Sequence, residues 1–331
     1  MRVWCPVPGP ATSGVARHAL DVAELLRASG VEVVVTCDLA PPAGPVDVTC
    51  VPFTDALFGD DVASAAAALG TWAVTAPRPL VVVLHDVPGT DPDPARDARR
   101  LAGYRRVVAA ADSVVVCSQR EAADLRSGTG VDPVLLPLPV VPLPPPGPMP
   151  AWADRPTVGV LGFVYPGKGH EDALSVVAAL GGGARVVALG GVSPGHGALL
   201  DGLHATAGSL GVELHATGPL SAADLHAAAL ATTVPFAAYR TLGASGSLVT
   251  WLTCGRRPVV AAGPQAAELT ARWPGSLLVV DRAELPALVG AALAGRVSTW
   301  REAPLPPDGT GAALAAVLRA ARARASAGAA R

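Results

Sequence analysis

The residue with the clearest chemical potential is Lys168, in the segment GFVYPGKGHE (162–171). It is the only lysine in the chain, because every other basic residue is an arginine. An apolar run precedes the segment and an Ala- and Leu-rich stretch follows it, so the segment joins a strand to a helix. A cation at the start of a helix is unfavourable unless an anion binds there. The pattern therefore predicts an anion site at Lys168.

Two other interpretations of this segment are open. Lys168 can be a surface residue that pairs with Glu171, three positions along the helix. The spacing Gly-x4-Gly-Lys also matches the phosphate loop of nucleotide hydrolases. Gly169, however, stands where that loop needs Ser or Thr to bind Mg²⁺, so the sequence argues against a hydrolase and offers no metal site.

A second candidate loop has the sequence YRTLGASGS (239–247) and leads into a helix that ends at Cys254 and Gly255. The free N–H groups at the start of that helix, together with the hydroxyls of Ser245 and Ser247 beside Gly246, suit a phosphate. Arg240 adds positive charge. The alternative is an ordinary capped loop.

A third loop, PGPATSG (8–14), separates the apolar strand WCPV from a helix that begins near Val15. Gly14 lets the backbone approach an anion, while Arg17 and His18 follow one turn into the helix and are candidates for contacting an acceptor substrate. The plain alternative is a turn in which Ser13 caps the helix.

A fourth loop follows the apolar run LVVVL and contains His85 and Asp86. Functional side chains of α/β proteins stand at strand ends, so we expect these residues to bind a sugar hydroxyl or transfer a proton. A structural histidine is the alternative. The pairs Ser118…Glu121 and Ser221…Asp224 predict helix caps and no chemistry.

Short β-branched runs alternate with helical stretches along nearly the whole chain. Continuous apolar runs suit strands that are buried on both faces of a parallel sheet. In the first helix, apolar residues recur every three or four positions and Gly30 ends the pattern. The sequence therefore predicts an α/β protein with doubly wound, Rossmann-like parallel sheets. The expected strands include residues 31–35, 80–84, 113–117, 157–162, 185–190 and 257–262.

The composition changes once, in the proline-rich stretch 134–156, where we expect an extended connector without helix. This change in composition predicts two domains, one on either side of the connector, that face a central cleft. We expect a final helix to pack back on the first domain. The expected boundaries are 1–137 for the N-terminal domain, 138–155 for the linker, 156–300 for the C-terminal domain and 301–331 for the helix.

The composition also excludes several classes of protein. The chain has 331 residues, 25 basic and 27 acidic, and a net charge of −2, which argues against binding to nucleic acid or to an anionic membrane surface. No apolar stretch approaches the roughly 20 residues of a membrane span, and the first residues do not resemble a signal peptide. The five cysteines are scattered and typical of buried thiols in a reducing compartment. We therefore expect a cytoplasmic location.

Taken in order, these loops resemble those of GT-B glycosyltransferases of family 4. The resemblance spans about residues 10–275. It is carried by SGVARHALDVAELLRASGVEV (13–33), LHDVP (84–88), ADSVVVCSQREAADL (111–125), GFVYPGKGHEDAL (162–174), GPLSAADLHAAALATTVPF (218–236) and SGSLVTWLTCGRRPVVAA (245–262).

The resemblance implies a sugar transfer from a nucleotide diphosphate sugar, with a UDP-sugar as the first guess. It further implies retention of configuration, no metal, no other cofactor, and a small molecule or glycan as acceptor. In the donor domain, Lys168 and the stretch that begins at Gly218 are implied to contact the nucleotide and its phosphates. His85 is implied to lie on the side of the sugar or acceptor, and Gly14 in the family's glycine loop.

The chain departs from the family pattern at two places. Phe163 occupies the position of an arginine that often accompanies the lysine, and the Glu-x7-Glu pair is replaced by Leu242 and Thr250. The alternative function is therefore a degenerate relative that binds a nucleotide or sugar without transferring it. An unrelated two-domain ligand-binding protein is a third hypothesis.

Overall fold

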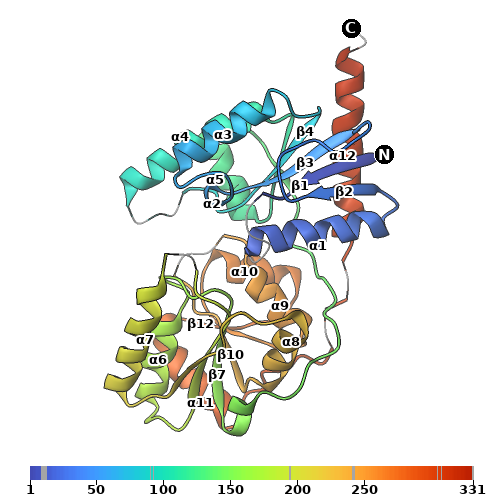
Figure 1. Ribbon diagram of the computed structural model, residues 1–331. Coiled ribbons are helices and arrows are strands. Elements are labelled where there is room, and N and C mark those ends of the chain that lie inside the picture. The colour runs from blue at the N-terminus through green and yellow to red at the C-terminus, as the bar shows by residue number, and fades with distance from the viewer. Residues whose placement is uncertain are drawn as a thin grey trace. The chain divides into compact units, whose positions relative to one another are not determined.

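The computed structural model describes residues 1–8, 13–89, 91, 93–193, 195–240, 243–303, 305–306 and 308–329, with side chains to residue 327 (Figure 1). It consists of two compact units. The first unit contains Met1–Pro139 and Asp308–Arg331, and the second contains Val140–Pro307.

The first unit is built around a six-stranded sheet in the order β2-β1-β3-β4-β5-β6, in which every neighbouring pair is parallel. Its strands are β1 (Arg2–Pro6), β2 (Glu32–Thr36), β3 (Val48–Phe53), β4 (Leu80–Leu84), β5 (Ser113–Val116) and β6 (Val134–Leu135). Its helices are α1 (Gly14–Ala28), α2 (Asp55–Phe58), α3 (Val62–Ala73), α4 (Pro94–Ala110), α5 (Gln119–Thr129) and α12 (Thr310–Ala329).

The second unit repeats the architecture with the order β12-β11-β10-β7-β8-β9, again parallel throughout. Counted from β7, this is the Rossmann strand order 3-2-1-4-5-6. Its strands are β7 (Thr157–Leu161), β8 (Arg185–Leu189), β9 (Leu214–Ala216), β10 (Val234–Phe236), β11 (Val259–Ala261) and β12 (Leu278–Val280). Its α-helices are α6 (His170–Ala179), α7 (Gly197–Leu210), α8 (Ala222–Ala231), α9 (Gly246–Thr253), α10 (Pro264–Arg272) and α11 (Leu285–Leu293).

These two sheets confirm the predicted Rossmann-like α/β fold. The central strands β4, β7 and β8 are buried along their whole length, as parallel strands covered on both faces should be. The helix predicted to begin near Val15 is α1, whose cap is the Ser13 hydroxyl accepting from the Ala16 N–H at 2.9 Å. Its buried face consists of Ala16, Ala19, Val22, Ala23 and Leu26, which recur every three or four positions as predicted.

The proline-rich stretch differs from the prediction of a wholly extended linker. Residues 151–154 form a 3-10 helix, Ala151–Asp154, because the buried Trp152 packs with Leu161 and Leu189 of the second sheet. Arg185 stabilises the same turn by donating to the Trp152 carbonyl and, at 2.9 Å, to the Asp154 carboxylate. It also donates to the Glu213 carboxylate at 2.6 Å. The expected linker thus belongs to the second unit from Val140 onward, together with residues 301–307.

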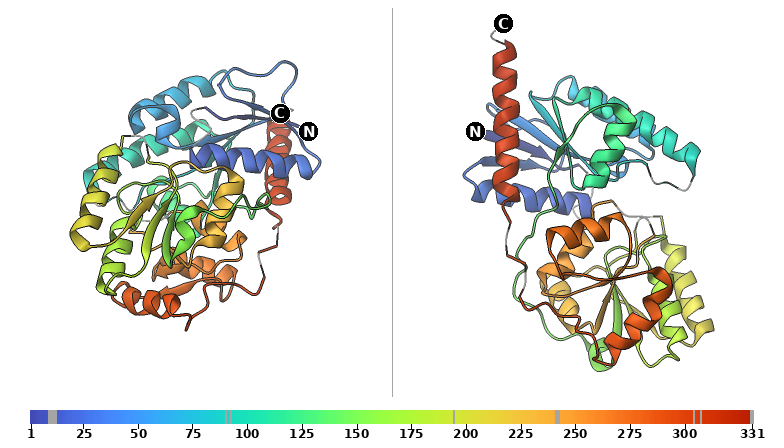
Figure 2. Two further views of the ribbon diagram at one scale, coloured as in Figure 1. Left: turned by 60° about the horizontal axis from the view of Figure 1, so that its bottom comes forward. Right: turned by 180° about the vertical axis from the view of Figure 1, so that it is seen from behind.

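The last helix, α12, returns to the first unit and lies beside α1 in both views of Figure 2. It begins at Thr310, so the stretch expected as a C-terminal helix from 301 divides between the two units. Gly311 makes the close approach possible, since a methyl group there would lie 2.7 Å from the Leu25 carbonyl oxygen. Further along, Arg322 pairs with Asp47 at 2.9 Å.

Among the described residues, no helix is both long and apolar enough to cross a bilayer. All five cysteines are free thiols. Four of them are buried and Cys37 is exposed, which fits the expectation of buried apolar thiols at four positions.

The packing of α12 predicts the effect of Gly311→Ala. The added methyl group meets the backbone of α1, so we expect a loss of about 1–3 kcal/mol in the free energy of unfolding. Gly70→Ala in α3 is the matched control, because a methyl group at Gly70 meets no atom within 4 Å and alanine favours a helix. Thermal unfolding followed by circular dichroism measures both. A melting temperature for Gly311→Ala equal to that of Gly70→Ala would contradict the packing.

Candidate functional site

The topology of the second sheet brings two of the predicted loops together. The strand order reverses between β7 and β10, which pair directly. Ligands of open α/β sheets bind at the carboxyl ends of the strands beside such a reversal. The segments that follow these two strands are the Lys168 loop, 162–169, and the 237–245 segment that leads to α9.

Lys168 is enclosed by side chains from both loops. Its side chain is buried, with 4% exposed. The Nζ donates to the Ser247 Oγ at 2.9 Å and lies 4.0 Å from the centre of the Tyr239 ring and 5.5 Å from that of Tyr165. It forms no ion pair with Glu171 or with any other described carboxylate, so the surface-pair alternative is wrong.

Burial has a direct electrostatic consequence for Lys168. An ammonium group removed from water, with no carboxylate to compensate it, loses its proton easily. Burial accordingly lowers the pKa of Lys168 to about 7. The neighbouring His170 is fully buried, and neither ring nitrogen has a hydrogen-bond partner in the described part of the chain. Burial and the charge of Lys168 lower the pKa of His170 to about 4, so this ring is neutral.

Gly162 is a site residue that the sequence analysis did not single out. Its φ of +109° favours glycine, and a methyl group there would lie 2.6 Å from the Ser247 Oγ and 3.1 Å from the Lys168 Nζ. The sequence shows a glycine after an apolar run but does not show which side chain lies against it. The bare Cα makes room for the lysine and the serine.

The serine-rich loop forms the start of α9, as predicted. The buried Ser245 is the N-cap and accepts from the Leu248 N–H at 3.3 Å. Gly246 and Ser247 open the first turn, where N–H groups have no partners within the helix. The helix therefore presents its positive end beside the Lys168 ammonium, an arrangement suited to a phosphate.

A charged network holds the loop that carries Tyr239. The carboxylate of Asp172, in the first turn of α6, pairs with Arg240 at 3.2 Å and with Arg282 at 3.2 Å. Arg282 also donates to the carbonyls of Ala238 and Tyr239, at 3.1 and 2.8 Å. The predicted extra cation, Arg240, is thus engaged by a carboxylate. The sequence did not show the role of Arg282, because this residue lies 43 positions beyond Tyr239 and still further from Asp172.

The remaining predicted donor residues are less enclosed. Phe163 is half-buried in the Lys168 loop, and Gly218 adopts φ +68° after β9, with open space where a side chain would stand. Thr250 lies inside α9 and donates its hydroxyl to the Gly246 carbonyl at 2.9 Å. Leu242 falls outside the described residues.

In the first unit, the predicted His85 and His18 lie together. Their ring centres are 5.0 Å apart in an edge-to-face arrangement. His85 is buried and its Nε2 has no partner among the described residues. Burial lowers the pKa of His85 to about 4, and burial together with the charge of His85 lowers that of His18 to about 3. Both rings are therefore neutral at pH 7 and suit hydrogen bonding.

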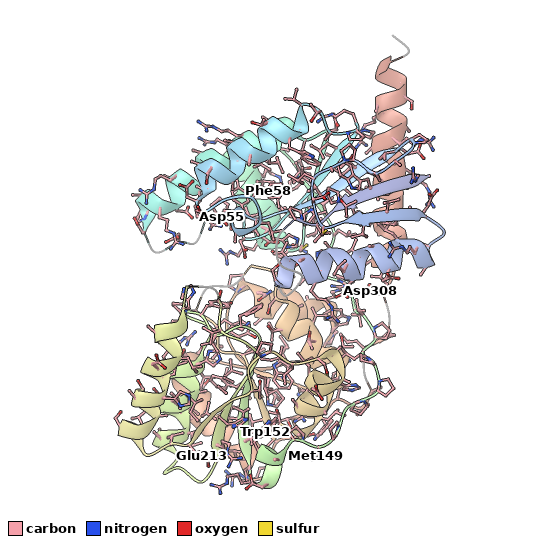
Figure 3. All side chains as sticks on the ribbon, in the orientation of Figure 1. Asp55, Phe58, Met149, Trp152, Glu213 and Asp308 are labelled. Atoms are coloured by element: carbon pink, nitrogen blue, oxygen red, sulfur yellow. The ribbon has the colours of Figure 1, made fainter. Side chains whose placement is uncertain are left out.

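Asp86 follows His85 in a strained conformation with φ +53°. Its carboxylate accepts from the Thr54 hydroxyl at 3.1 Å, and its carbonyl accepts from Arg100 at 2.7 Å. Arg100 also pairs at 3.4 Å with Asp55, which Figure 3 labels on α2. These contacts join the loops after β3 and β4, which are neighbouring strands.

The two other predicted residues of the first unit differ from each other. Arg17 is exposed on α1 and pairs with Asp21 at 3.2 Å, which occupies it with a surface contact. Gly14 is exposed at the start of α1, and a methyl group there would meet no described atom within 4 Å, so nothing in the described chain requires glycine at this position. Residues 9–12 of the same predicted loop lie outside the described residues.

Comparison with solved structures identifies the fold. HepE from Anabaena in complex with UDP-glucose is 16% identical, with a TM-score of 0.68 over 90% of this chain and 91% of HepE. Sucrose-phosphate synthase from Thermosynechococcus elongatus is 15% identical, with a TM-score of 0.65 over 88% of each chain. WaaG, a glycosyltransferase involved in lipopolysaccharide biosynthesis, is 16% identical, with a TM-score of 0.57 over 89% of this chain and 90% of WaaG. The chain has the GT-B fold.

The GT-B fold predicted from the loops is thereby confirmed, and the similar structures are GT-B glycosyltransferases. No protein-family model matches the sequence, and no curated protein matches it. At these identities the likeness is one of fold. The function must therefore be argued from the site itself.

The environment of Lys168 predicts an unusual titration. Because the chain has one lysine, protein labelled with ¹³C,¹⁵N-lysine reports on this side chain alone in NMR spectra. We expect its Cε and Nζ signals to titrate with a midpoint near 7, since burial lowers the pKa to about 7. The urea-unfolded protein is the control, with a midpoint near 10.4. A midpoint near 10 in the folded protein would show that the ammonium is solvated.

Proposed function

We propose that this protein is a glycosyltransferase that moves a sugar from a nucleotide diphosphate sugar, with a UDP-sugar as the first candidate, to a small-molecule or glycan acceptor. The observation that carries the proposal is the buried Lys168 ammonium. It has no described carboxylate partner and lies next to the amino end of α9 at the reversal point of a Rossmann-type sheet. HepE, of the same fold, is described in complex with UDP and with UDP-glucose.

The chemistry of sugar transfer explains why such a site is useful. When the bond between sugar and phosphate breaks, negative charge accumulates on the departing diphosphate. A lysine and helix N–H groups fixed in a desolvated pocket stabilise that charge more in the transition state than in the ground state. The resemblance to family 4 supports a retaining, metal-independent reaction.

His85 in the first unit is assigned to the sugar and acceptor side, with Asp86 and His18. Its ring can accept a hydrogen bond from a sugar hydroxyl, because burial lowers its pKa to about 4 and keeps it neutral at pH 7. His18 packs against it and limits its orientation. Asp86 supplies a second acceptor whose position the Thr54 hydroxyl fixes.

A binding protein without transferase activity is the second candidate. The observation that favours it is Thr250, whose hydroxyl is committed to the Gly246 carbonyl and offers no carboxylate to a ligand. Both candidates predict nucleotide binding. Only the transferase releases UDP from a nucleotide sugar, so a panel of nucleotide sugars and acceptors separates them.

The proposal predicts that Lys168→Met weakens UDP binding at least about tenfold. One charge-assisted hydrogen bond contributes about 1.5–3 kcal/mol, and methionine keeps most of the length of the side chain while removing the charge. Isothermal titration calorimetry measures the affinity. Arg155→Met is the matched control, because Arg155 precedes β7 at the opposite end of that strand. Equal UDP affinity in Lys168→Met and the native protein would refute the assignment.

The assignment of His85 gives a separate prediction. His85→Ala should leave the affinity for UDP within about twofold of the native value, because we assign UDP to the second unit. Its turnover should fall by about two- to tenfold, because one hydrogen bond to the reacting sugar contributes about 0.5–1.5 kcal/mol. UDP release from the accepted nucleotide sugar measures turnover. Unchanged turnover would remove His85 from the reaction.

A further inference from the structure

The surroundings of the Lys168 Nζ differ from those of an ordinary buried cation. Buried lysines are normally paired with a carboxylate. Here the contacts are the Ser247 hydroxyl at 2.9 Å, the face of Tyr239 at 4.0 Å and the ring of Tyr165 at 5.5 Å. Aromatic faces attract a cation but carry no charge that could neutralise it. These contacts stabilise the ammonium in part, but they supply no negative charge to neutralise it.

The other ionisable groups around Lys168 do not change this balance near neutral pH. His170 is neutral, because burial and the Lys168 charge lower its pKa to about 4. The Tyr239 phenol stays protonated, since burial raises its pKa. The Asp172 carboxylate is shared by Arg240 and Arg282. Lys168 is thus the group of this cluster that can change its charge between about pH 6 and 9.

We propose that capture of a nucleotide diphosphate at this site is coupled to the uptake of one proton by Lys168, and that Tyr239 is the positioning residue that sets how readily Lys168 takes it. This inference rests on the proposed function. The proton comes from solvent or buffer and bonds to the lone pair of Nζ, and no other bond forms or breaks. The bound diphosphate supplies the negative charge that the free site lacks.

The coupling follows from linkage. An anion within a few ångströms favours the charged form of a lysine, so binding must raise the pKa of Lys168. Burial lowers the pKa of free Lys168 to about 7. The affinity for the diphosphate therefore falls as the pH rises through about 7, because more of the unliganded protein must first be protonated. Below that pH, binding takes up little or no proton.

The first test uses the only lysine in the chain as its own reporter. The ¹³C,¹⁵N-lysine signals are titrated with and without saturating UDP-glucose. UDP-glucose is preferable to UDP because its phosphates are both esterified, whereas a terminal phosphate has a second pKa near 6. We expect the ligand to raise the midpoint by at least about one pH unit, a tenfold change in proton affinity. An unchanged midpoint in the saturated protein overturns the inference.

The second test counts protons directly. Calorimetric titration with UDP-glucose in two buffers of different ionisation enthalpy gives the number of protons taken up. With a free pKa of about 7, we expect about 0.4 proton at pH 8 if the ligand raises the pKa by one unit and about 0.9 if the bound lysine is fully protonated, with almost none at pH 5.5. Lys168→Arg keeps its charge throughout this range and should bind with no proton uptake at either pH. Proton uptake by Lys168→Arg equal to that of the native protein overturns the inference.

Substitutions that remove or change the aromatic ring test the role of Tyr239. Tyr239→Leu should lower the NMR midpoint of free Lys168, because the cation–π contact is lost, while Tyr239→Phe should keep it within a few tenths of a unit. Tyr239→Trp, with the strongest cation–π face, should raise it, and this variant serves if the leucine variant does not fold. Tyr165→Leu removes the more distant ring and should have a smaller effect. Equal midpoints in all the folded variants overturn the positioning role.

These outcomes distinguish a failure of the proposed function from a failure of the proton coupling. If UDP-glucose and the other nucleotide sugars fail to bind at any pH, the proposed function fails, whatever the free lysine does. If UDP-glucose binds with no proton uptake and an unchanged lysine midpoint, the nucleotide site stands and the coupling fails.

Discussion

The second unit depends on one electrostatic constraint, which is a lysine ammonium held out of water without a carboxylate. Such a group is costly unless it is solvated, paired or deprotonated. The unit supplies partial support through the Ser247 hydroxyl and the Tyr239 ring, and it aims the amino end of α9 at the same place. Gly162 completes the arrangement by offering no side chain of its own. The uncompensated ammonium and the amino end of α9 favour an anion as the missing partner.

The first unit also holds candidate site residues by burial, but these are histidine rings and not a lysine. It buries His85 beside His18 and keeps both rings neutral, so this unit adds hydrogen-bonding groups without adding charge. The strained Asp86 backbone is held from two directions by Thr54 and Arg100. The candidate groups of the first unit are thus hydrogen-bond acceptors, whereas the candidate group of the second unit is a cation.

Much of this could be predicted from local sequence. Apolar runs before Gly162 and His85 revealed strand ends, and the single lysine drew attention to a residue that the structure buries between two loops. What the sequence could not show depends on partners distant in the chain. Tyr239 meets Lys168 because β10 pairs with β7, and Arg282 reaches the Tyr239 carbonyl from beyond β12. The 3-10 helix at Ala151–Asp154 was missed because buried Trp152 outweighs the surrounding prolines. Short strands such as β9 and β12 are too brief for periodicity to identify.

The central claim is that a nucleotide diphosphate binds against Lys168, and comparison of UDP with uridine tests it most directly. The single lysine resonance of labelled protein is followed at pH 6.5 while each compound is added. The account predicts that UDP moves the signal in a saturable way and that uridine, which has the base and ribose without the phosphates, leaves it nearly unchanged. UDP that binds with no change in the lysine signal, or that does not bind at all, would contradict the account.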